Sequence, residues 1–279
     1  MKNQIIPCLW FNGNAKEAAT FYSTIFKDTK WTEENPFVSS FESSGQKFMC
    51  LNGGPQFQIN PSISFYVQCD TADEVNQAWE GLIQGGSVLM PLDKYDWSAW
   101  YGWVQDRYGI SWQLSLGKPE DTGQKFVPFL MFTGEQNGRA EQAIQFYTSV
   151  FKHSGVTGIL RYGPGENENE NAVKHAQFNL GKNVFMVMES SLPHDFGFNE
   201  AVSFVVDCDT QQEIDYYWEK LSAVPEAEQC GWLKDQFGVS WQIVPSILPE
   251  LLSNPAKAEA VTTAFMQMKK FDIEALKRA

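Results

Sequence analysis

Apolar and polar residues along the chain switch repeatedly between the period of a strand and the period of a helix. Residues 5–11 form a short apolar run that ends in Asn-Gly, which predicts a strand. Ala18 and Tyr22 then recur at helical spacing. Asn14, with Glu17 three residues later, resembles a capping box, so we predict that a helix begins there.

The pattern continues through residue 116 and repeats the same order of elements. After a predicted strand at 62–69, the run Asp70-Thr71-x-x-Glu74 predicts the start of a second amphipathic helix. Each half of the chain therefore reads as β-α-β-β(-β) performed twice. The other predicted strands of the first half lie near residues 37–42, 46–52, 87–92, 102–106 and 110–116.

Three ordered blocks of the first half return in the second half, which indicates an internal duplication. We call the halves copy one and copy two. They predict a domain at 1–120, a second domain at 125–247 and a C-terminal helical extension at 248–279. The matched blocks are Pro7–Lys27 with Pro128–Lys152, Ser64–Leu82 with Ser203–Leu221, and Gly102–Gln113 with Gly231–Gln242.

The strands of the second module alternate in polarity. Ser64, Tyr66 and Gln68 point to one side of their strand, and the apolar residues between them point to the other. Ser111 and Gln113 alternate in the same way. One face should therefore pack under helices, while the polar and aromatic face should curl around a wet pocket.

Charge and composition narrow the class of partner. Lys and Arg total 21 against 34 Asp and Glu, a net charge of -13, so binding to nucleic acid is not expected. Five cysteines without CxxC spacing favour reduced, buried thiols. The first residues carry no leader pattern, and no apolar run approaches membrane-spanning length. We expect a cytoplasmic protein that does not engage a membrane.

These residues resemble a known family. The openings Pro7-x-Leu-x-Phe-x-Gly13 and Pro128-x-Leu-x-Phe-x-Gly134 and the paired Gly-Trp-x-x-Asp-x-x-Gly-x-Ser-Trp-Gln blocks are similar to the PhnB-like branch of the vicinal-oxygen-chelate superfamily, whose members sometimes carry the label 3-demethylubiquinone-9 3-methyltransferase. The superfamily includes glyoxalase I, extradiol dioxygenases and bleomycin-resistance proteins. The resemblance implies an α+β glyoxalase fold, in which paired βαβββ modules form a curled mixed sheet, with two such domains in tandem plus C-terminal helices.

The resemblance also implies where a divalent metal would bind, at four inward strand positions. Of the residues there, only Gln113 and Gln242 are plausible ligands, whereas a divalent cation needs several donors, preferably with an anionic one. We therefore predict no metal and no cofactor. The implied positions are about Pro7 (or Ile6), Cys50, Ser64 and Gln113 in copy one, and about Pro128, Val187, Ser203 and Gln242 in copy two.

The histidines, two aspartates and the known catalytic motifs are the remaining candidates for other chemistry. Of the three histidines, His153 and His194 fit surface positions, and His175 starts a strand from which it could reach a cavity mouth. Asp106 and Asp235 precede an aromatic-Gly pair and are expected to form turns. The sequence carries no GxSxG elbow, P-loop or Rossmann glycine pattern, and no glycine-rich loop for S-adenosylmethionine.

The leading hypothesis is a metal-independent small-molecule-binding protein of the glyoxalase/bleomycin-resistance type. One alternative is an isomerase, lyase or dioxygenase with a degenerate metal site, and another is a non-catalytic scaffold or regulatory protein. The chain would act as a homodimer or as a pseudo-dimeric monomer. The predicted ligand-binding residues are Phe48, Asn52, Ser64, Tyr66, Gln68, Trp97, Tyr101, Trp103, Ser111 and Gln113.

Overall fold

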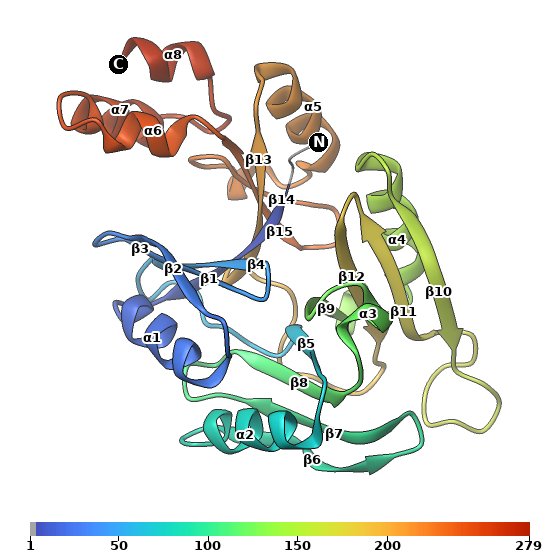
Figure 1. Cartoon of the computed structure of the whole chain (residues 1–279). Coiled ribbons are helices and arrows are strands. Elements are labelled where there is room, and N and C mark those ends of the chain that lie inside the picture. Colours follow the sequence, from blue (N-terminus) through green and yellow to red (C-terminus); the bar gives the residue numbers. More distant parts are fainter. Residues whose placement is uncertain (1–3) are drawn as a thin grey trace. The chain divides into compact units, whose positions relative to one another are not determined.

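The computed structural model describes residues 4–279, which divide into two compact units. One unit is Cys8–Val202, and the other is Ser203–Ala279 with the described residues up to Pro7. Figure 1 shows the elements of both. Each unit draws residues from both copies, so the division into domains at 1–120 and 125–247 describes the repeat in the sequence and, as a statement about folding domains, stays a prediction.

The centre of the larger unit is an eight-stranded sheet that takes four strands from each copy. β5 and β9 join the copies by antiparallel pairing, while β5–β8 and β9–β12 pair in parallel. The predicted mixed sheet is thus confirmed. In order across the sheet, the strands are β10 (Gly155–Arg161), β11 (Val173–Leu180), β12 (Asn183–Glu189), β9 (Phe126–Phe132), β5 (Ile63–Cys69), β8 (Ser111–Leu116), β7 (Ser98–Gln105) and β6 (Ser87–Tyr95).

The first module of copy one supplies four further strands. β1 (Ile5–Phe11) pairs in parallel with β4 (Gln46–Asn52), and β3 (Val38–Ser43) lies antiparallel to β4. These three strands confirm the predicted runs. The fourth, β2 (Lys30–Glu34), was not predicted, because nearly all of its side chains are exposed and its sequence shows no apolar alternation.

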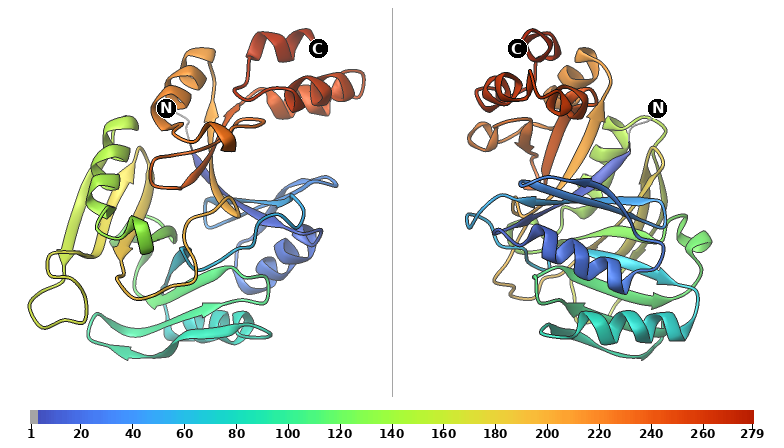
Figure 2. Two further views of the ribbon diagram at one scale, coloured as in Figure 1. Left: turned by 180° about the vertical axis from the view of Figure 1, so that it is seen from behind. Right: turned by 60° about the vertical axis from the view of Figure 1, so that its left-hand side comes forward.

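Two helices of copy one begin where predicted, but only one has the predicted cap. Thr71 accepts a hydrogen bond from Glu74 N at 3.1 Å and caps α2 (Ala72–Leu82). Asn14 precedes α1 (Ala15–Ile25), yet its side chain makes no capping bond. Asn52, from the end of β4, accepts the Ala15 N–H instead, at 2.9 Å. Figure 2 shows α1 and α2 running side by side.

Copy two repeats this module with α4 (Ala140–Val150), which follows the short 3-10 turn Gly134–Gln136. A four-residue helix, α3 (Pro119–Thr122), lies in the predicted join between the copies. Among residues 4–279, no helix combines the length and apolarity that a membrane crossing requires.

The apolar face of β5 and β8 forms an aromatic core, as the alternation predicts. Trp112 is fully buried, with ring centroids 5.4 Å from Phe65 and 5.3 Å from Tyr22 of α1. Phe48 of β4 packs edge-on to Phe65 at 5.3 Å. Burying each such ring stabilises the fold by about 1.5–3 kcal/mol, so this face anchors the helices and leaves the opposite face for other contacts.

The smaller unit contains the second module of copy two and the C-terminal extension. β13 (Val202–Cys208) pairs in parallel with β15 (Ser240–Pro245), which pairs antiparallel with β14 (Trp232–Lys234). The predicted helical extension forms three helices, and it docks on α5 (Gln211–Leu221) through Gln211, whose Oε1 accepts from Ile273 N and whose Nε2 donates to Phe271 O. They are α6 (Leu248–Ser253), α7 (Ala258–Met266) and α8 (Ile273–Arg278).

Candidate functional site

A chain of hydrogen bonds crosses the polar face of the eight-stranded sheet in copy one. Tyr101 of β7 donates from its hydroxyl to Gln113 Oε1 at 2.8 Å, and Gln113 Nε2 donates to Ser64 Oγ at 2.8 Å. The three residues are 4%, 4% and 1% exposed. Strand pairing places them together, because Ser64 and Tyr66 of β5 lie beside β8, and Gln113 pairs with Tyr66.

An aromatic group surrounds the outer end of this chain. Trp97 stacks on Tyr95 with ring centroids 4.8 Å apart, and both rings meet Tyr101 edge-on, at 6.0 and 5.7 Å. Tyr66 lies 6.5 Å from Tyr101. Trp97 is 63% exposed although it is held by its neighbours. We call Ser64, Tyr66, Tyr95, Trp97, Tyr101 and Gln113 the aromatic site.

Copy two completes this face of the sheet with apolar side chains. Val127, Phe129, Val184 and Met186 form a buried cluster against which Tyr66 packs. His175 of β11 lies with its ring 5.6 Å from that of Phe129. The face is thus polar and aromatic in copy one and apolar in copy two.

Burial keeps several titratable groups of this face uncharged. Burial raises the pKa of Tyr101, and the neighbouring Tyr66 and Tyr95 raise it further. Burial also raises the pKa of Tyr66, against a lowering by its hydrogen bond to Ser115. The pKa of His175 is lowered by burial, so its imidazole is neutral at pH 7. Tyr66, Tyr101 and His175 are therefore neutral hydrogen-bonding groups, and Asp93, which lies opposite Tyr101 on the edge strand β6, adds an exposed carboxyl beside them.

Eight of the ten predicted ligand-binding residues lie on this face. Ser64, Tyr66, Tyr101, Gln113 and Trp97 belong to the aromatic site itself. Trp103 lies opposite Gln113 in the strand pair β7–β8, and its Nε1 donates to Ser111 Oγ at 2.6 Å. Gln68 lies at the end of β5, and its buried Oε1 accepts no hydrogen bond from the described residues.

The other two predicted residues lie elsewhere. Phe48 stacks on Phe41 at 5.1 Å, in the aromatic core on the opposite face of β5. Asn52 caps α1, and its Nδ2 donates to Pro36 O at 3.1 Å. The structure therefore does not bring Phe48 or Asn52 together with the aromatic site.

The residues at the metal positions of the superfamily do not fit a divalent cation. Both amide atoms of Gln113 are engaged, by Tyr101 and Ser64, and Gln242 Nε2 donates to Ser203 Oγ at 3.0 Å in the same way. Such a cation needs several oxygen or nitrogen donors, preferably anionic. Among residues 4–279, no three His, Cys, Asp or Glu side chains lie close enough together to hold a metal.

The side chains of copy two on this face are also unsuitable ligands. The resemblance implies metal positions at Pro128 and Val187, but Phe129 lies opposite Ser64, and Met186 packs in the same cluster as Phe129. Because strand side chains alternate, the inward positions are one residue away from the predicted ones.

The expected turn role of Asp106 is supported by its contacts. Asp106 Oδ1 accepts from Tyr108 N and Ile110 N at 2.8 and 3.0 Å. Its Oδ2 accepts from Trp112 Nε1 and the Tyr22 hydroxyl at 2.8 and 2.9 Å. Asp235 repeats the turn bonds with Phe237 N and Val239 N. Each carboxyl is thus occupied by groups of its own turn, and Asp106 is not directed at the aromatic site.

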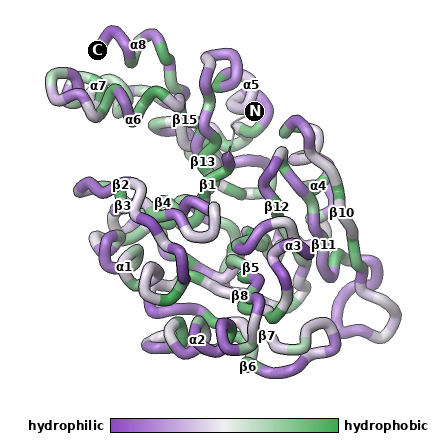
Figure 3. The backbone as a smooth tube through the Cα atoms, in the orientation of Figure 1, coloured by the Kyte–Doolittle hydropathy of each residue, from purple (hydrophilic) through white to green (hydrophobic). Residues whose placement is uncertain are grey.

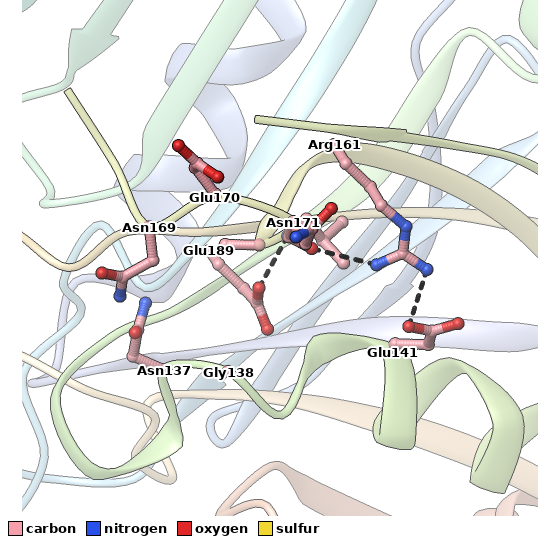
Figure 4. Close-up of a pocket in the computed structure, with 10 residues that line it drawn as sticks. Asn137, Gly138, Glu141, Arg161, Asn169, Glu170, Asn171 and Glu189 are labelled. Atoms are coloured by element: carbon pink, nitrogen blue, oxygen red, sulfur yellow. Dashed lines mark hydrogen bonds and ion pairs between the residues drawn. The ribbon is translucent and has the colours of Figure 1, made fainter. Parts of the chain in front are cut away.

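A second candidate site, which the sequence analysis missed, is a pocket at the start of α4 (Figure 4). It has a volume of about 240 Å³, and we call it the α4 pocket. The Glu189 carboxylate is 2% exposed and accepts Ala140 N at 2.8 Å and Val173 N at 2.6 Å. The lining residues are Asn137, Gly138, Glu141, Arg161, Asn169, Glu170, Asn171, Ala172, Val173 and Glu189.

The α4 pocket depends on the acidic loop between β10 and β11, residues 162–172, which is largely hydrophilic (Figure 3). Glu168 anchors this loop by accepting from Ser191 N at 2.9 Å, and Arg161 Nη1 donates to Asn171 O at 3.0 Å. The sequence carried one signal of the pocket. Copy two has extra residues here, beside a strand that ends in Glu189 where copy one has Asn52.

His194 and His153 occupy different settings. His194 Nε2 lies 2.9 Å from Ser190 Oγ, beside the anchored loop. His153 has a positive φ of 57° in the turn after α4, beyond Phe151 and Lys152, where its carbonyl accepts from Asn179 Nδ2 at 2.9 Å. Neither lies in the aromatic site.

Comparison with known proteins agrees with this fold. The family described as 3-demethylubiquinone-9 3-methyltransferase matches residues 3–115 and again residues 124–244, which confirms the tandem duplication. A search of curated proteins gave no significant match.

Solved structures resemble either one copy or the whole chain. A PhnB protein from Bacillus cereus is 35% identical, and the match covers 40% of this chain and 98% of that one, with a TM-score of 0.38. A Pseudomonas aeruginosa protein is 26% identical over 40% and 96% of the two chains, with a TM-score of 0.36. Glyoxalase I from Zea mays is 12% identical over 90% and 96%, with a TM-score of 0.56, which supports the glyoxalase fold alone.

Proposed function

Since this chain belongs to the 3-demethylubiquinone-9 3-methyltransferase family, within the vicinal-oxygen-chelate superfamily, we propose that it is a metal-independent protein that binds a flat, uncharged small molecule at the aromatic site. The observation that carries the proposal is Trp97, a large ring that is 63% exposed yet fixed by stacking on Tyr95. A rigid exposed indole offers a large apolar contact area at low entropic cost.

The neighbouring groups suit the same ligand. A flat ring stacked on Trp97 would meet Tyr101, whose hydroxyl is already engaged by Gln113. The unpartnered Oε1 of Gln68, at the end of β5, could accept a hydrogen bond from a ligand hydroxyl after a small rotation. Tyr66, Tyr101 and His175 are all neutral at pH 7, so none of these three groups favours a charged ligand.

Metal independence rests on the saturated amide of Gln113. A cation would have to displace the Tyr101 hydroxyl from Oε1 and would still lack an anionic ligand. The name of the family refers to a quinone-type ring and to methyl transfer. The proposed ligand shares the flat ring. Methyl transfer is not part of the proposal, because burial raises the pKa of Tyr66 and Tyr101 and leaves neither hydroxyl suited to act as a base.

The test is binding of a short-chain demethylubiquinone analogue, followed by intrinsic fluorescence with and without EDTA. We expect quenching that saturates with the same Kd in both conditions. In Trp97→Ala, the Kd should rise at least tenfold. Tyr216→Ala, in the smaller unit, is the matched control and should bind normally. Binding that requires a stoichiometric metal would favour the enzymatic alternative, and unchanged binding by Trp97→Ala would refute the proposed site.

A further inference from the structure

The α4 pocket is independent of the aromatic site and has a different chemistry. We propose that it binds a small organic cation, a protonated amine that carries an oxygen acceptor next to the ammonium group. Its volume of about 240 Å³ lies below the range of pockets for drug-sized ligands, about 300–1,000 Å³, so the ligand has only a few non-hydrogen atoms.

Glu189 is the central group of this proposal. A carboxylate can accept about four hydrogen bonds, and Glu189 accepts one from Ala140 N and one from Val173 N, while it lines the pocket. A buried charge is costly unless it is fully paired. An ammonium group in the pocket would supply both the missing donors and the opposite charge.

The charges around the pocket favour a cation over an anion. Glu141, Glu170 and Glu189 line it, against one cation, Arg161. Arg161 is already engaged, because its Nη2 donates to Glu141 Oε2 at 2.7 Å and its Nη1 to Asn171 O. Figure 4 shows Arg161 and Glu141 at one end, and Asn137 and Asn169 at the other, with Glu189 between the two pairs.

Asn137 is the reason that the proposed ligand carries an oxygen acceptor. Its Nδ2 is covered and has no hydrogen-bond partner among the described residues. The last torsion of an asparagine side chain is soft, so a modest rotation can direct this nitrogen into the pocket. A carbonyl or hydroxyl oxygen on the ligand would satisfy it, at a gain of about 1 kcal/mol or more.

The corresponding region of copy one is built differently. The carboxylate position is held by Asn52, whose Nδ2 is satisfied by Pro36 O, and the loop there spans only residues 35–37. Asn52 is therefore a natural negative reference within the same chain. The proposal predicts binding in copy two and none in copy one.

The experiment is an NMR titration of the full chain with glycinamide, which carries an ammonium group beside a carbonyl. We expect the backbone amides of Ala140 and Val173 to shift in parallel, with a Kd on the order of 1 mM for so small a probe. Acetamide, which lacks the ammonium, should bind at least tenfold more weakly, and the Ala15 amide beside Asn52 should not move.

Variants make the assignment specific to the pocket. Glu189→Gln should weaken glycinamide binding at least tenfold, with its fold checked by the dispersion of the amide spectrum. Should that variant not fold, exposed Glu170→Ala is expected to weaken binding by about two- to fivefold, and Trp97→Ala should leave it unchanged. Shifts absent from Ala140 and Val173, equal binding of acetamide, or undiminished binding by the folded Glu variants would each overturn the proposal.

Discussion

The first module ends in Asn52 in copy one and in Glu189 in copy two, and both side chains accept a hydrogen bond from the start of a helix. Asn52 Oδ1 accepts the N–H of Ala15, and Glu189 Oε1 accepts the N–H of Ala140, each the first residue of its helix. The second polar atom of the side chain is a donor in Asn52 and an acceptor in Glu189. Asn52 Nδ2 donates to Pro36 O, whereas Glu189 Oε2 accepts from Val173 N.

The loops beside the two side chains also differ between the copies. An amide needs a carbonyl from the following loop, and a carboxylate needs an N–H, so neither side chain is satisfied by the loop of the other copy. The short loop 35–37 supplies the carbonyl, and the long loop 162–172 leads into the N–H of Val173. A change of one capping residue thus came with an inserted loop and a pocket.

Removal of the Glu189 carboxylate should have the largest effect on this comparison. Glu189→Ala leaves the buried N–H groups of Ala140 and Val173 without an acceptor, and each unsatisfied donor costs about 1–3 kcal/mol. We expect a loss of about 4 kcal/mol in the free energy of unfolding, measured by urea denaturation followed by circular dichroism. A loss below about 1 kcal/mol would show that water replaces the carboxylate.

The second effect is a change in the free energy of unfolding with pH. Asn52, the capping residue of copy one, is neutral, but copy one also contains a buried carboxyl, Asp106. Burial raises the pKa of Asp106 to about 6, against hydrogen bonds that lower it, from an ordinary 3.8. Between these values the folded state binds more protons than the unfolded state, so stability falls as pH rises from about 4 to about 6 and then levels off.

At about 1.4 kcal/mol for each pKa unit, the fall amounts to about 3 kcal/mol in total. Urea denaturation from pH 4 to 7 would measure it. Asp106→Asn should remove this part of the pH dependence while lowering stability at every pH. An unchanged slope in Asp106→Asn would assign the titration to another group.

Removal of the copy-one cap should cost less than removal of Glu189. Asn52→Ala deletes one helix cap and a bond to Pro36 O, and caps of this kind contribute about 1 kcal/mol. Asn52→Asp keeps the acceptor for Ala15 N but sets a carboxylate against a carbonyl, so it should not restore full stability. Equal losses for Asn52→Ala and Glu189→Ala would erase the distinction between the copies.

The smallest effect is expected at the rim of the α4 pocket. The Arg161–Glu141 ion pair has side chains 38% and 41% exposed, and pairs of this kind contribute about 0.5 kcal/mol. Arg161→Ala should therefore lower stability only slightly, and the difference should shrink in 1 M salt because exposed charges are screened. A loss above about 2 kcal/mol would mean that the hydrogen bond from Arg161 to Asn171 O in the loop contributes more to stability than the ion pair with Glu141.

Much of the fold follows from local patterns in the sequence. The alternation in 62–69 and 110–116 correctly separates the buried Phe65 and Trp112 from the polar face of Ser64 and Gln113. The repeat correctly divides the chain into equivalent modules. β2 escaped prediction because an exposed edge strand carries no apolar alternation.

The sites were harder to predict, because they depend on contacts between distant segments. Tyr66, Tyr101 and Gln113 could be grouped, since neighbouring strands carry them. Phe48 was assigned to the wrong face, because β4 belongs to the first module and its buried side, which carries Phe48 and Cys50, packs on the core face of β5. The α4 pocket needs Glu189, the start of α4 and a distant loop to meet, and no local period encodes that meeting.

The antiparallel pairing of β5 with β9 has a consequence for fragments of this protein. A polypeptide ending at residue 120 would leave the backbone N–H and C=O groups of β5 unpaired along one side, and such an open edge recruits another strand. Expressed alone, this fragment should therefore self-associate through β5. Adding the complementary fragment from residue 125 onward should convert those assemblies into discrete heterodimers, as gel filtration would reveal.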